Sequence, residues 1–300
     1  MSCAESQQFK VWAFLKRNAT LLSHDEYRAG HVGYHCSNTR RLKDIRGYAV
    51  NIHDQDDEGL HERLSSSGAI TQRAQPEGFL EMWDGFPAVL FDTRAAWLAA
   101  ATPEASRAAP EGLIVDPDWS LADGPYLFDR ISENSTQFRS YHTRMEEYVV
   151  KPVVRFESRP CKLMLFFRPQ TSLDHVDFRH RFFAKYVELL AAMPELNGLV
   201  ANFRDRDIDA APRDYYPSDH WCFSEEGRNF RQQFYSLWTG ALECYVHELD
   251  EFVTARQRHP QLEQLMALED ELFEALWYVQ VDENIIVMPN RGLAPPFYHR

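Results

Sequence analysis

Histidines in the first half of the sequence are the side chains best suited to acid–base chemistry. His31 and His35 lie one helical turn apart in the segment Ser23–His35, so both would face the same side of a helix. His35 follows Tyr27 on that face and should be partly buried, where an imidazole can take or donate a proton near neutral pH. The alternative interpretation is a core histidine whose hydrogen bonds the fold satisfies.

Three polar residues are the candidate catalytic partners of His35. Asn51 or Tyr48 would stabilise a developing oxyanion, and Asp84, if it faces the same pocket, would be an acid–base partner. Each also has a structural interpretation. Asn51 can bond to a strand end, and Asp84, which comes just before a glycine, can shape a turn.

Metal and nucleotide chemistry find little support. The HxxxH spacing of His31 and His35 suits a metal-binding pair, but no third ligand is written nearby. No GxSxG, GxGxxG or P-loop pattern occurs, so nucleotide-dependent chemistry is not indicated. We therefore predict no metal and no cofactor.

The bulk composition excludes several classes of protein. The chain of 300 residues has a formal charge of −13, which argues against nucleic acid as a partner because phosphate binding needs a basic surface. No apolar run reaches the roughly 18 residues of a membrane helix, so we expect no membrane partner. The N-terminus shows no secretory pattern, and the five cysteines form no CxxC pair. Reduced thiols in a cytoplasmic protein are the expectation.

The elements that must position these residues recur in two diverged copies. FKVWAFLKR at Phe9 resembles CKLMLFFRP at Cys161, and IRGYAVNI at Ile45 resembles LNGLVANF at Leu196. From Tyr27 to Asn51 the first copy aligns without a gap on the second, which sets His35 on Tyr186 and Asn51 on Asn202. The third strands, WDGFPAVLFD and WTGALECYVH, share a Trp-x-Gly start.

Each copy therefore predicts a β-α-β-β-α-β unit, the split βαβ arrangement of ferredoxin-like domains. Long polar loops are expected after the second strands, and the last strands at Tyr126–Asn134 and Trp277–Val287. We expect a first repeat at 1–134, a linker at 135–159 and a second repeat at 160–300. The first strands are apolar on both faces, so the two sheets should cover each other within one chain. The predicted fold class is α+β, with tandem ferredoxin-like repeats that form an intramolecular two-sheet α+β barrel.

The sequence resembles the EthD family of dimeric α+β barrel proteins. The resemblance rests on SHDEYRAGHVGYH at Ser23, on RGYAVNI, on WDGFPAVLFDTRAAW and on TGALECYVHELDEF. It implies an apolar pocket per unit for small organic molecules, often aromatic or polyketide-like. The wider superfamily includes cofactor-free cyclases, isomerases, lyases and monooxygenases as well as haem enzymes. The family's helix usually ends in a motif with a histidine, which His35 matches and Tyr186 does not, so we expect the first copy to keep the site.

Aromatic residues could form the wall of such a pocket, although core packing alone would also explain them. The candidate substrate-binding residues are Trp12, Phe14, His31, Trp83, Phe86, Tyr186 and Asn202.

The favoured hypothesis is a cofactor-independent lyase, cyclase or dehydratase. It would act by general acid–base catalysis on a small apolar aromatic or polyketide-like ketone or phenol. Two alternatives stay open. The first is a non-catalytic protein that binds a hydrophobic metabolite, and the second is a cofactor-free or haem-dependent monooxygenase. A homodimer is also possible.

Overall fold

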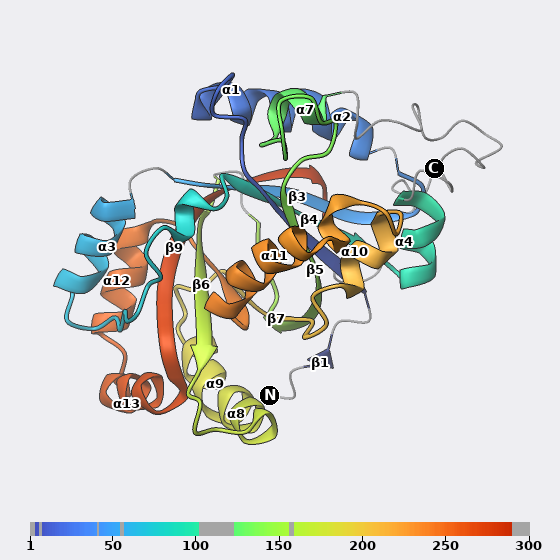
Figure 1. The fold of residues 1–300 in the computed structure, drawn as a ribbon. Helices are drawn as coiled ribbons and strands as arrows, with labels where there is room; N and C mark the ends of the chain where they lie inside the picture. Colours follow the sequence, from blue (N-terminus) through green and yellow to red (C-terminus); the bar gives the residue numbers. More distant parts are fainter. Residues whose placement is uncertain are drawn as a thin grey trace.

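The computed structural model describes residues 4–5, 8–40, 42–54, 57–101, 123–155 and 159–289. Its centre is one antiparallel sheet that closes on itself (Figure 1). The first repeat supplies the strands β2 (Phe9–Leu15), β3 (Ile45–His53), β4 (Gly85–Phe91) and β5 (Ser140–Lys151). The second supplies β6 (Cys161–Pro169), β7 (Gly198–Arg204), β8 (Gly240–Val246) and β9 (Phe273–Val287).

The strand order confirms the predicted fold class. The strands follow the order β5-β2-β4-β3-β9-β6-β8-β7, and β7 pairs back onto β5. Each repeat therefore has its fourth strand beside its first, then its third and second, as in a split βαβ unit. The seams β3–β9 and β5–β7 join the repeats, so each repeat closes the open sheet edges of the other. The short strand β1 (Ala4–Glu5) adds to β5.

The last strand of the first repeat is not where the sequence predicted it. The segment expected as a strand at Tyr126–Asn134 contains the end of a short helix, α7 (Gly124–Leu127), and irregular chain. The strand is β5, which lies inside the range 135–159 that we expected to be a linker. Lys10 pairs with Met145 and Lys162 with Val281, so β5 is the counterpart of β9. The repeat boundaries themselves stay a prediction.

Helices cover the outer faces of the barrel. The first repeat has α1 (His24–Ala29), the π-helical turn η1 (Gly30–His35), α2 (Cys36–Thr39) and α4 (Arg94–Ala101). The second has α8 (His175–Arg181), the π-helical turn η3 (Phe182–Tyr186), α9 (Val187–Ala191), α12 (Leu249–Gln257) and α13 (Leu262–Leu272). The segment between β8 and β9 thus forms two helices, α12 and α13. Figure 1 shows α1, α2 and α7 at one end of the molecule and α8, α9 and α13 at the other.

A capping box starts α1. The Ser23 hydroxyl accepts from the Glu26 amide, and the Ser23 amide donates to the Glu26 carboxylate at 2.8 Å. The Asp174 carboxylate caps α8 by accepting hydrogen bonds from the backbone amides of Val176 and Asp177. These caps fix where each first helix begins, and therefore which of its residues face the sheet.

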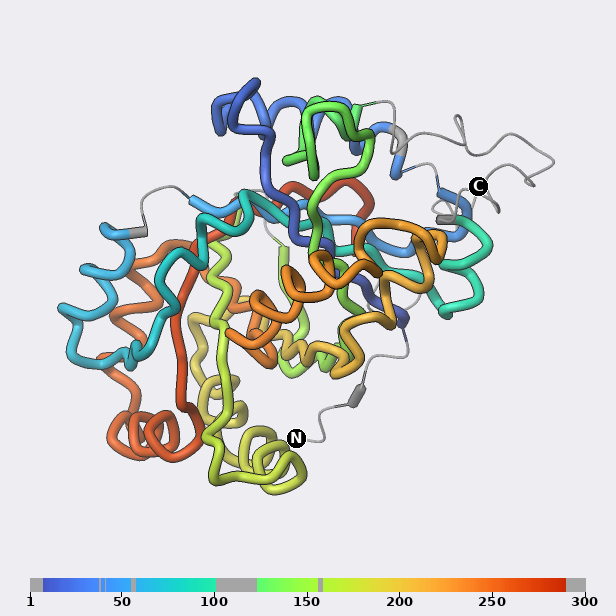
Figure 2. The backbone as a smooth tube through the Cα atoms, viewed as in Figure 1, coloured from blue at the N-terminus to red at the C-terminus, as the bar shows by residue number. Residues whose placement is uncertain are grey.

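The two segments expected as polar loops contain helices, and the helices of each segment pack against the other repeat. After β3 come α3 (Asp57–Ser66) and η2 (Phe79–Glu81). After β7 come α10 (Ala210–Tyr215), η4 (Trp221–Phe223) and α11 (Glu225–Leu237). Figure 2 shows α3 beside the helices of the second repeat and α10 beside α4 of the first. Arg256 donates to the Ala69 carbonyl at 2.9 Å, and Arg94 to Asp214 at 2.9 Å, so each insertion is tied to the other repeat.

Inward-facing side chains form two layers inside the barrel. One layer is aromatic and apolar and includes Trp12, Phe14, Phe86, Phe166 and Trp277. The other layer is charged, and its members are Lys10, Lys162, Glu147, Glu243, Glu283, Asn51 and Asn202. No helix in the described part of the chain is long and apolar enough to cross a membrane.

Candidate functional site

A small apolar cavity lies between the outer face of the first sheet and the helices that cover it. Its volume is about 60 Å³, roughly the space of two water molecules. It would therefore hold the reacting end of a substrate rather than a whole one. The apolar lining comes from β2, β4, α4 and the segments around them: Val11, Ala13, Leu15, Leu42, Pro87, Val89, Trp97, Phe128 and Phe138. The polar lining is His35, Thr39, Tyr48, His142 and Tyr215.

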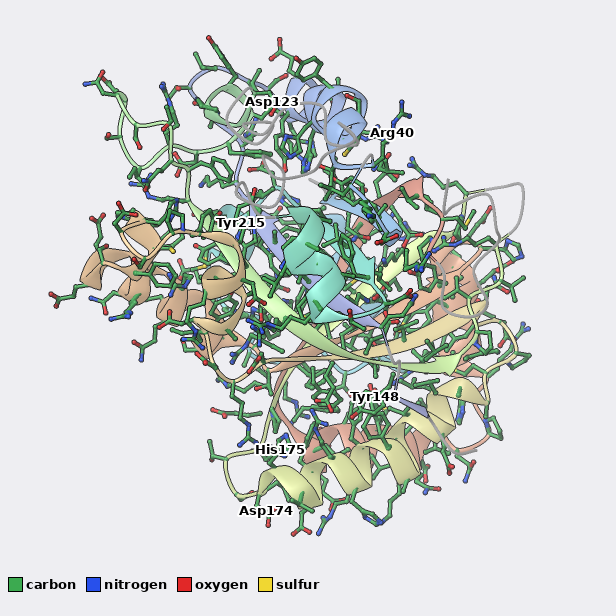
Figure 3. All side chains as sticks on the ribbon, turned by 90° about the vertical axis from the view of Figure 1, so that its right-hand side faces the viewer. Arg40, Asp123, Tyr148, Asp174, His175 and Tyr215 are labelled. Atoms are coloured by element: carbon green, nitrogen blue, oxygen red, sulfur yellow. The ribbon has the colours of Figure 1, made fainter. Side chains whose placement is uncertain are left out.

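His35 stands on the wall of this cavity and is held by a carboxylate. It ends the π-helical turn η1, a local widening of the helix that often occurs at functional sites. Its Nδ1 lies 2.8 Å from Asp123 Oδ1, and both side chains are buried. An ionised carboxylate only accepts, so Nδ1 carries the proton and Nε2 is the basic nitrogen. The Phe128 ring packs against the imidazole at 5.2 Å between centroids. Figure 3 labels Asp123 near the end of the molecule that carries α1 and α2.

His31 supports His35 from one turn earlier. Its Nδ1 lies 3.0 Å from the Tyr27 hydroxyl, and the two imidazole rings are 5.4 Å apart. Burial, together with His35, holds the pKa of His31 well below its usual value. His31 is therefore neutral at pH 7. When His35 takes up a proton, it has no second positive charge beside it.

Tyr48 also reaches the cavity, as part of β3. Its hydroxyl lies 3.1 Å from Cys36 Sγ. Burial raises the pKa of Cys36 to about 12 and lifts the pKa of Tyr48 well above its usual range. Both groups therefore stay protonated, and Tyr48 can donate a hydrogen bond but cannot act as a base.

Two asparagines from the sequence prediction lie elsewhere. Asn51 Oδ1 accepts from Lys162 at 2.8 Å, and Asn202 Oδ1 accepts from Lys10 at 2.7 Å. Both belong to the charged layer inside the barrel. Asn51 is an odd number of residues from Tyr48, so the two side chains point to opposite faces of β3. The structure does not bring Asn51 to His35.

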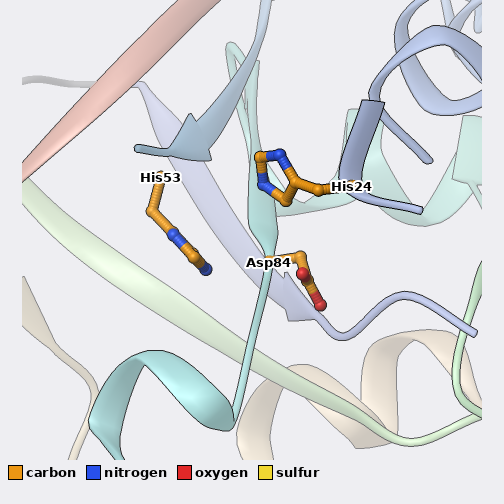
Figure 4. A group of neighbouring side chains, drawn as sticks. All are labelled: His24, His53 and Asp84. Carbon is orange, nitrogen blue, oxygen red and sulfur yellow. The ribbon is translucent and has the colours of Figure 1, made fainter. Parts of the chain in front are cut away.

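Asp84 is likewise not the partner of His35. One of its oxygens accepts from the Arg17 amide at 2.8 Å and the other lies 3.1 Å from Arg17 Nε. Its other neighbours are His24 and His53, and the possible ligand atoms of the three lie within 4.8 Å of one another (Figure 4).

The surroundings of His53 do not suit a metal ligand. Its Nδ1 lies 2.9 Å from the Asp54 carbonyl and its Nε2 2.8 Å from the Trp83 carbonyl. Both ring nitrogens therefore face backbone carbonyl oxygens. In the second repeat Arg204 makes the same two contacts, with the Asp205 carbonyl at 2.8 Å and the Trp238 carbonyl at 3.3 Å. A metal at this place would have to displace one of these carbonyls.

The predicted aromatic residues pack together inside the barrel. Trp12 and Phe14 are fully buried against Trp238 of the second repeat, and Phe86 packs against both of them. Trp83 closes the same cluster. None of these four lines the cavity that holds His35.

Tyr186, the counterpart of His35, is in a filled core. It is fully buried, packs against Phe182 and Phe273, and its hydroxyl lies 3.3 Å from Glu269. The core around it is rich in phenylalanines, including Phe167, Phe178 and Phe203.

Sequence reasoning missed Asp123, His142 and Tyr215. Asp123 is 88 positions from His35 in the chain, and β5, which carries His142, was taken for a linker. Tyr215 comes from the insertion of the second repeat and stacks on His142 at 5.3 Å. The period-2 pattern of β5 was the one available signal.

Comparison with known proteins bears on the fold. No family model matches the sequence, and no curated protein matches it significantly. A Fusobacterium nucleatum protein, provisionally assigned as a monooxygenase, matches 98% of this chain and 99% of its own. Its TM-score is 0.51 and its identity 7%. The chain is built on the dimeric α+β barrel fold.

Two further structures are similar at lower scores. A dimeric ferredoxin-like protein of Thermobifida fusca covers 43% of this chain and 96% of its own, at 16% identity and a TM-score of 0.28. A protein described as anthrone oxidase-like covers 96% of this chain and 95% of its own, at 7% identity and a TM-score of 0.44. At these identities the likeness concerns the fold alone.

Proposed function

We propose that the chain is a cofactor-independent enzyme that removes a proton next to the carbonyl of a small apolar ketone, or from the equivalent phenol. The observation that carries the proposal is that His35, on the wall of a largely apolar cavity, has its Nδ1 2.8 Å from Asp123. A carboxylate that holds Nδ1–H leaves Nε2 as the base and stabilises the imidazolium that forms.

The proton transfer can be written in full. His35 Nε2 takes the proton from the carbon, the C–H electrons move into the carbonyl group, and an enolate forms. Asp123 offsets the positive charge on His35. Return of a proton from His35 to carbon restores the ketone or gives its isomer. If that proton goes instead to a hydroxyl on the neighbouring carbon, the C–O bond breaks, water leaves and the product is dehydrated. If the enolate carbon attacks a second carbonyl of the same substrate, a C–C bond forms, the proton goes to that carbonyl oxygen and the product is cyclised.

The resemblance to the EthD family supports a substrate that is aromatic or polyketide-like. The apolar lining agrees with it, because residues such as Val11, Val89 and Phe128 offer only van der Waals contact. A non-catalytic carrier would need the apolar lining but not a histidine held by a buried carboxylate.

The test uses 2-tetralone, a small aromatic ketone with acidic hydrogens beside its carbonyl. Enzymatic proton abstraction in D₂O replaces these hydrogens by deuterium, which proton NMR follows as signal loss. We expect the protein to accelerate exchange over buffer, and His35→Gln to remove about 10²–10⁴-fold of the rate. Exchange at the buffer rate with 2-tetralone and a panel of related ketones and phenols would contradict the proposal.

A second candidate function is oxygenation, favoured by the monooxygenase assignment of the Fusobacterium protein of the same fold. The same carbanion would reduce dioxygen and form a C–O bond as a hydroperoxide. Loss of the second proton from that carbon with cleavage of the O–O bond would then give a carbonyl group and water, so the substrate supplies all four electrons. An oxygen electrode separates the two functions. Oxygen uptake in step with substrate loss supports the monooxygenase, and exchange without uptake supports the lyase or cyclase.

A further inference from the structure

His142 is a second histidine on the same cavity, from a different element and with different surroundings. It lies on β5, where it pairs with Ala13 of β2, another cavity residue. Its Nδ1 lies 3.0 Å from Ser140 Oγ and 3.4 Å from the Tyr216 hydroxyl. No carboxylate contacts it among the described residues.

The hydroxyl chain has a direction. The Tyr216 hydroxyl lies 3.1 Å from Ser140 Oγ, and burial raises its pKa well above the usual range, so it stays protonated. The only acceptors recorded for it in the described part of the chain are Ser140 Oγ and His142 Nδ1. Tyr216 therefore donates to Ser140 Oγ or to His142 Nδ1, and this geometry favours Nδ1 of His142 as the acceptor at the end of the chain.

A nitrogen that accepts carries no proton in the neutral ring. Because Nδ1 of His142 accepts, its proton is on Nε2. His35 has the opposite arrangement, since Asp123 holds the proton on Nδ1 and leaves Nε2 basic. The two cavity histidines are thus opposite tautomers.

His142 is also held neutral by what surrounds it. Burial, His220 and Arg231 together lower its pKa to about 3. Tyr215 stacks on its ring, and the guanidinium of Arg231 is fixed nearby by Asp209 and the Cys222 carbonyl. His220 stacks on Tyr216 at 3.9 Å. Tyr215, Tyr216 and His220 are uncharged or cationic, so none of them favours a positive charge on His142.

We infer that His142 is a catalytic hydrogen-bond donor, which uses Nε2–H to hold the carbonyl oxygen of the substrate while His35 removes the proton beside it. A neutral imidazole is a suitable donor to an enolate because it can donate a strong hydrogen bond to the oxygen without transferring the proton. This inference rests on the proposed function and narrows its substrate class. The substrate must present a carbonyl oxygen and an acidic C–H to two different walls of one cavity, as an enolisable ketone such as 2-tetralone does.

The tautomers can be measured without any substrate. Long-range ¹H–¹⁵N correlation spectra of the ¹⁵N-labelled protein distinguish Nδ1–H from Nε2–H histidines. We expect Nδ1–H for His35 and Nε2–H for His142, with His142 still neutral at pH 5. Tyr216→Phe removes the donor and should leave His142 as a mixture of tautomers. An Nδ1–H or protonated His142 at pH 6 would overturn the inference.

Exchange of 2-tetralone gives the second arm. Loss of one oxyanion donor typically costs 10²–10³-fold, so His142→Leu should slow exchange by about that factor. His142→Gln keeps an amide donor and should lose less. His61→Gln, a histidine on α3, is the matched control and should change nothing. If wild-type protein fails to exchange, the proposed function falls. If exchange depends on His35 but is the same in His142→Leu, only the role of His142 falls.

Discussion

At the scale of residues, the candidate site consists of two histidines. We infer that their hydrogen-bond partners place the ring proton on Nδ1 in His35 and on Nε2 in His142. Nδ1 of His35 lies beside a carboxylate, whereas Nδ1 of His142 lies beside two hydroxyls. The helical spacing of the sequence was enough to predict His35, and Tyr48 followed from its strand. Asp123 and His142 were not predictable, because the contacts that give them their roles join distant parts of the chain.

Asp123 should act by positioning His35. We expect Asp123→Asn to slow deuterium exchange by at least about 10²-fold, because an amide can present its NH₂ to Nδ1 and favour the wrong tautomer. The same NMR spectra report the cause, since His35 should then change from Nδ1–H to Nε2–H. A full rate with an unchanged tautomer would show that Asp123 is only a packing partner.

His142 should also make the free energy of unfolding depend on pH in the acid range. Its pKa is about 3 in the folded chain, against 6.5 for an ordinary histidine. Between these values the unfolded chain binds a proton that the folded chain does not, so the free energy of unfolding rises with pH across this window. Urea titrations should show a shallower rise from pH 4 to pH 6.5 for His142→Gln than for wild type. Parallel curves would contradict the buried, neutral state.

At the scale of elements, repeated residues proved reliable where they reflect packing. Gly85 and Gly240 begin β4 and β8, and an added Cβ would lie 2.9 Å from the Asn51 carbonyl or 2.6 Å from the Asn202 carbonyl. The shared Trp-x-Gly pattern therefore marks a close approach of two strands. The sequence failed at β5 because YLFDRISEN has the apolar start of a strand, whereas the true strand carries charged residues that face the polar layer and the seam.

Alanine at these glycines gives a direct test of the packing. We expect Gly240→Ala to lower the free energy of unfolding by about 1–3 kcal/mol, since a backbone oxygen must move. Gly33 in η1 has nothing within 4 Å of an added Cβ. Gly33→Ala is therefore the control and should be neutral or stabilise by up to about 1 kcal/mol. Equal losses in both variants would mean that the close approach is not what requires glycine.

The charged layer inside the barrel joins the two repeats. Lys10 of β2 bonds to Glu147 of its own repeat and Glu243 of the other, both at 2.6 Å. Lys10→Met would leave buried carboxylates without that cation, which typically costs about 3–5 kcal/mol. Lys10→Met with Glu147→Gln removes one charge of each sign and should recover much of the loss. A double variant as unstable as the single one would show that the network matters by shape and not by charge.

At the scale of the whole molecule, one chain forms a closed barrel, for which the family resemblance would imply two chains. Both seams of the barrel are internal, so we expect a thermal unfolding midpoint that is independent of protein concentration. A midpoint that rises over a hundredfold concentration range would point to a homodimer that stabilises the fold. The homodimer itself stays a prediction.

The cavity of the first repeat also depends on the second. Tyr215 lines it, and Tyr216 holds His142, although both follow β7 in the chain. Sequence comparison of the repeats could show that they had diverged, because His35 aligns with Tyr186. It could not show that the insertion of one repeat completes the site of the other, because this contact joins residues that are far apart in the sequence.

The central claim is that His35 of the first repeat transfers the proton and that Tyr186, its counterpart in the second repeat, has no such role. The most direct measurement compares deuterium exchange into 2-tetralone by His35→Gln and by Tyr186→Phe, with the melting temperature of each as the folding control. We predict a loss of about 10²–10⁴-fold in His35→Gln. Tyr186→Phe should keep its rate and lose at most about 1 kcal/mol of stability for one hydrogen bond. Equal small losses in both variants, or a large loss only in Tyr186→Phe, would contradict the account.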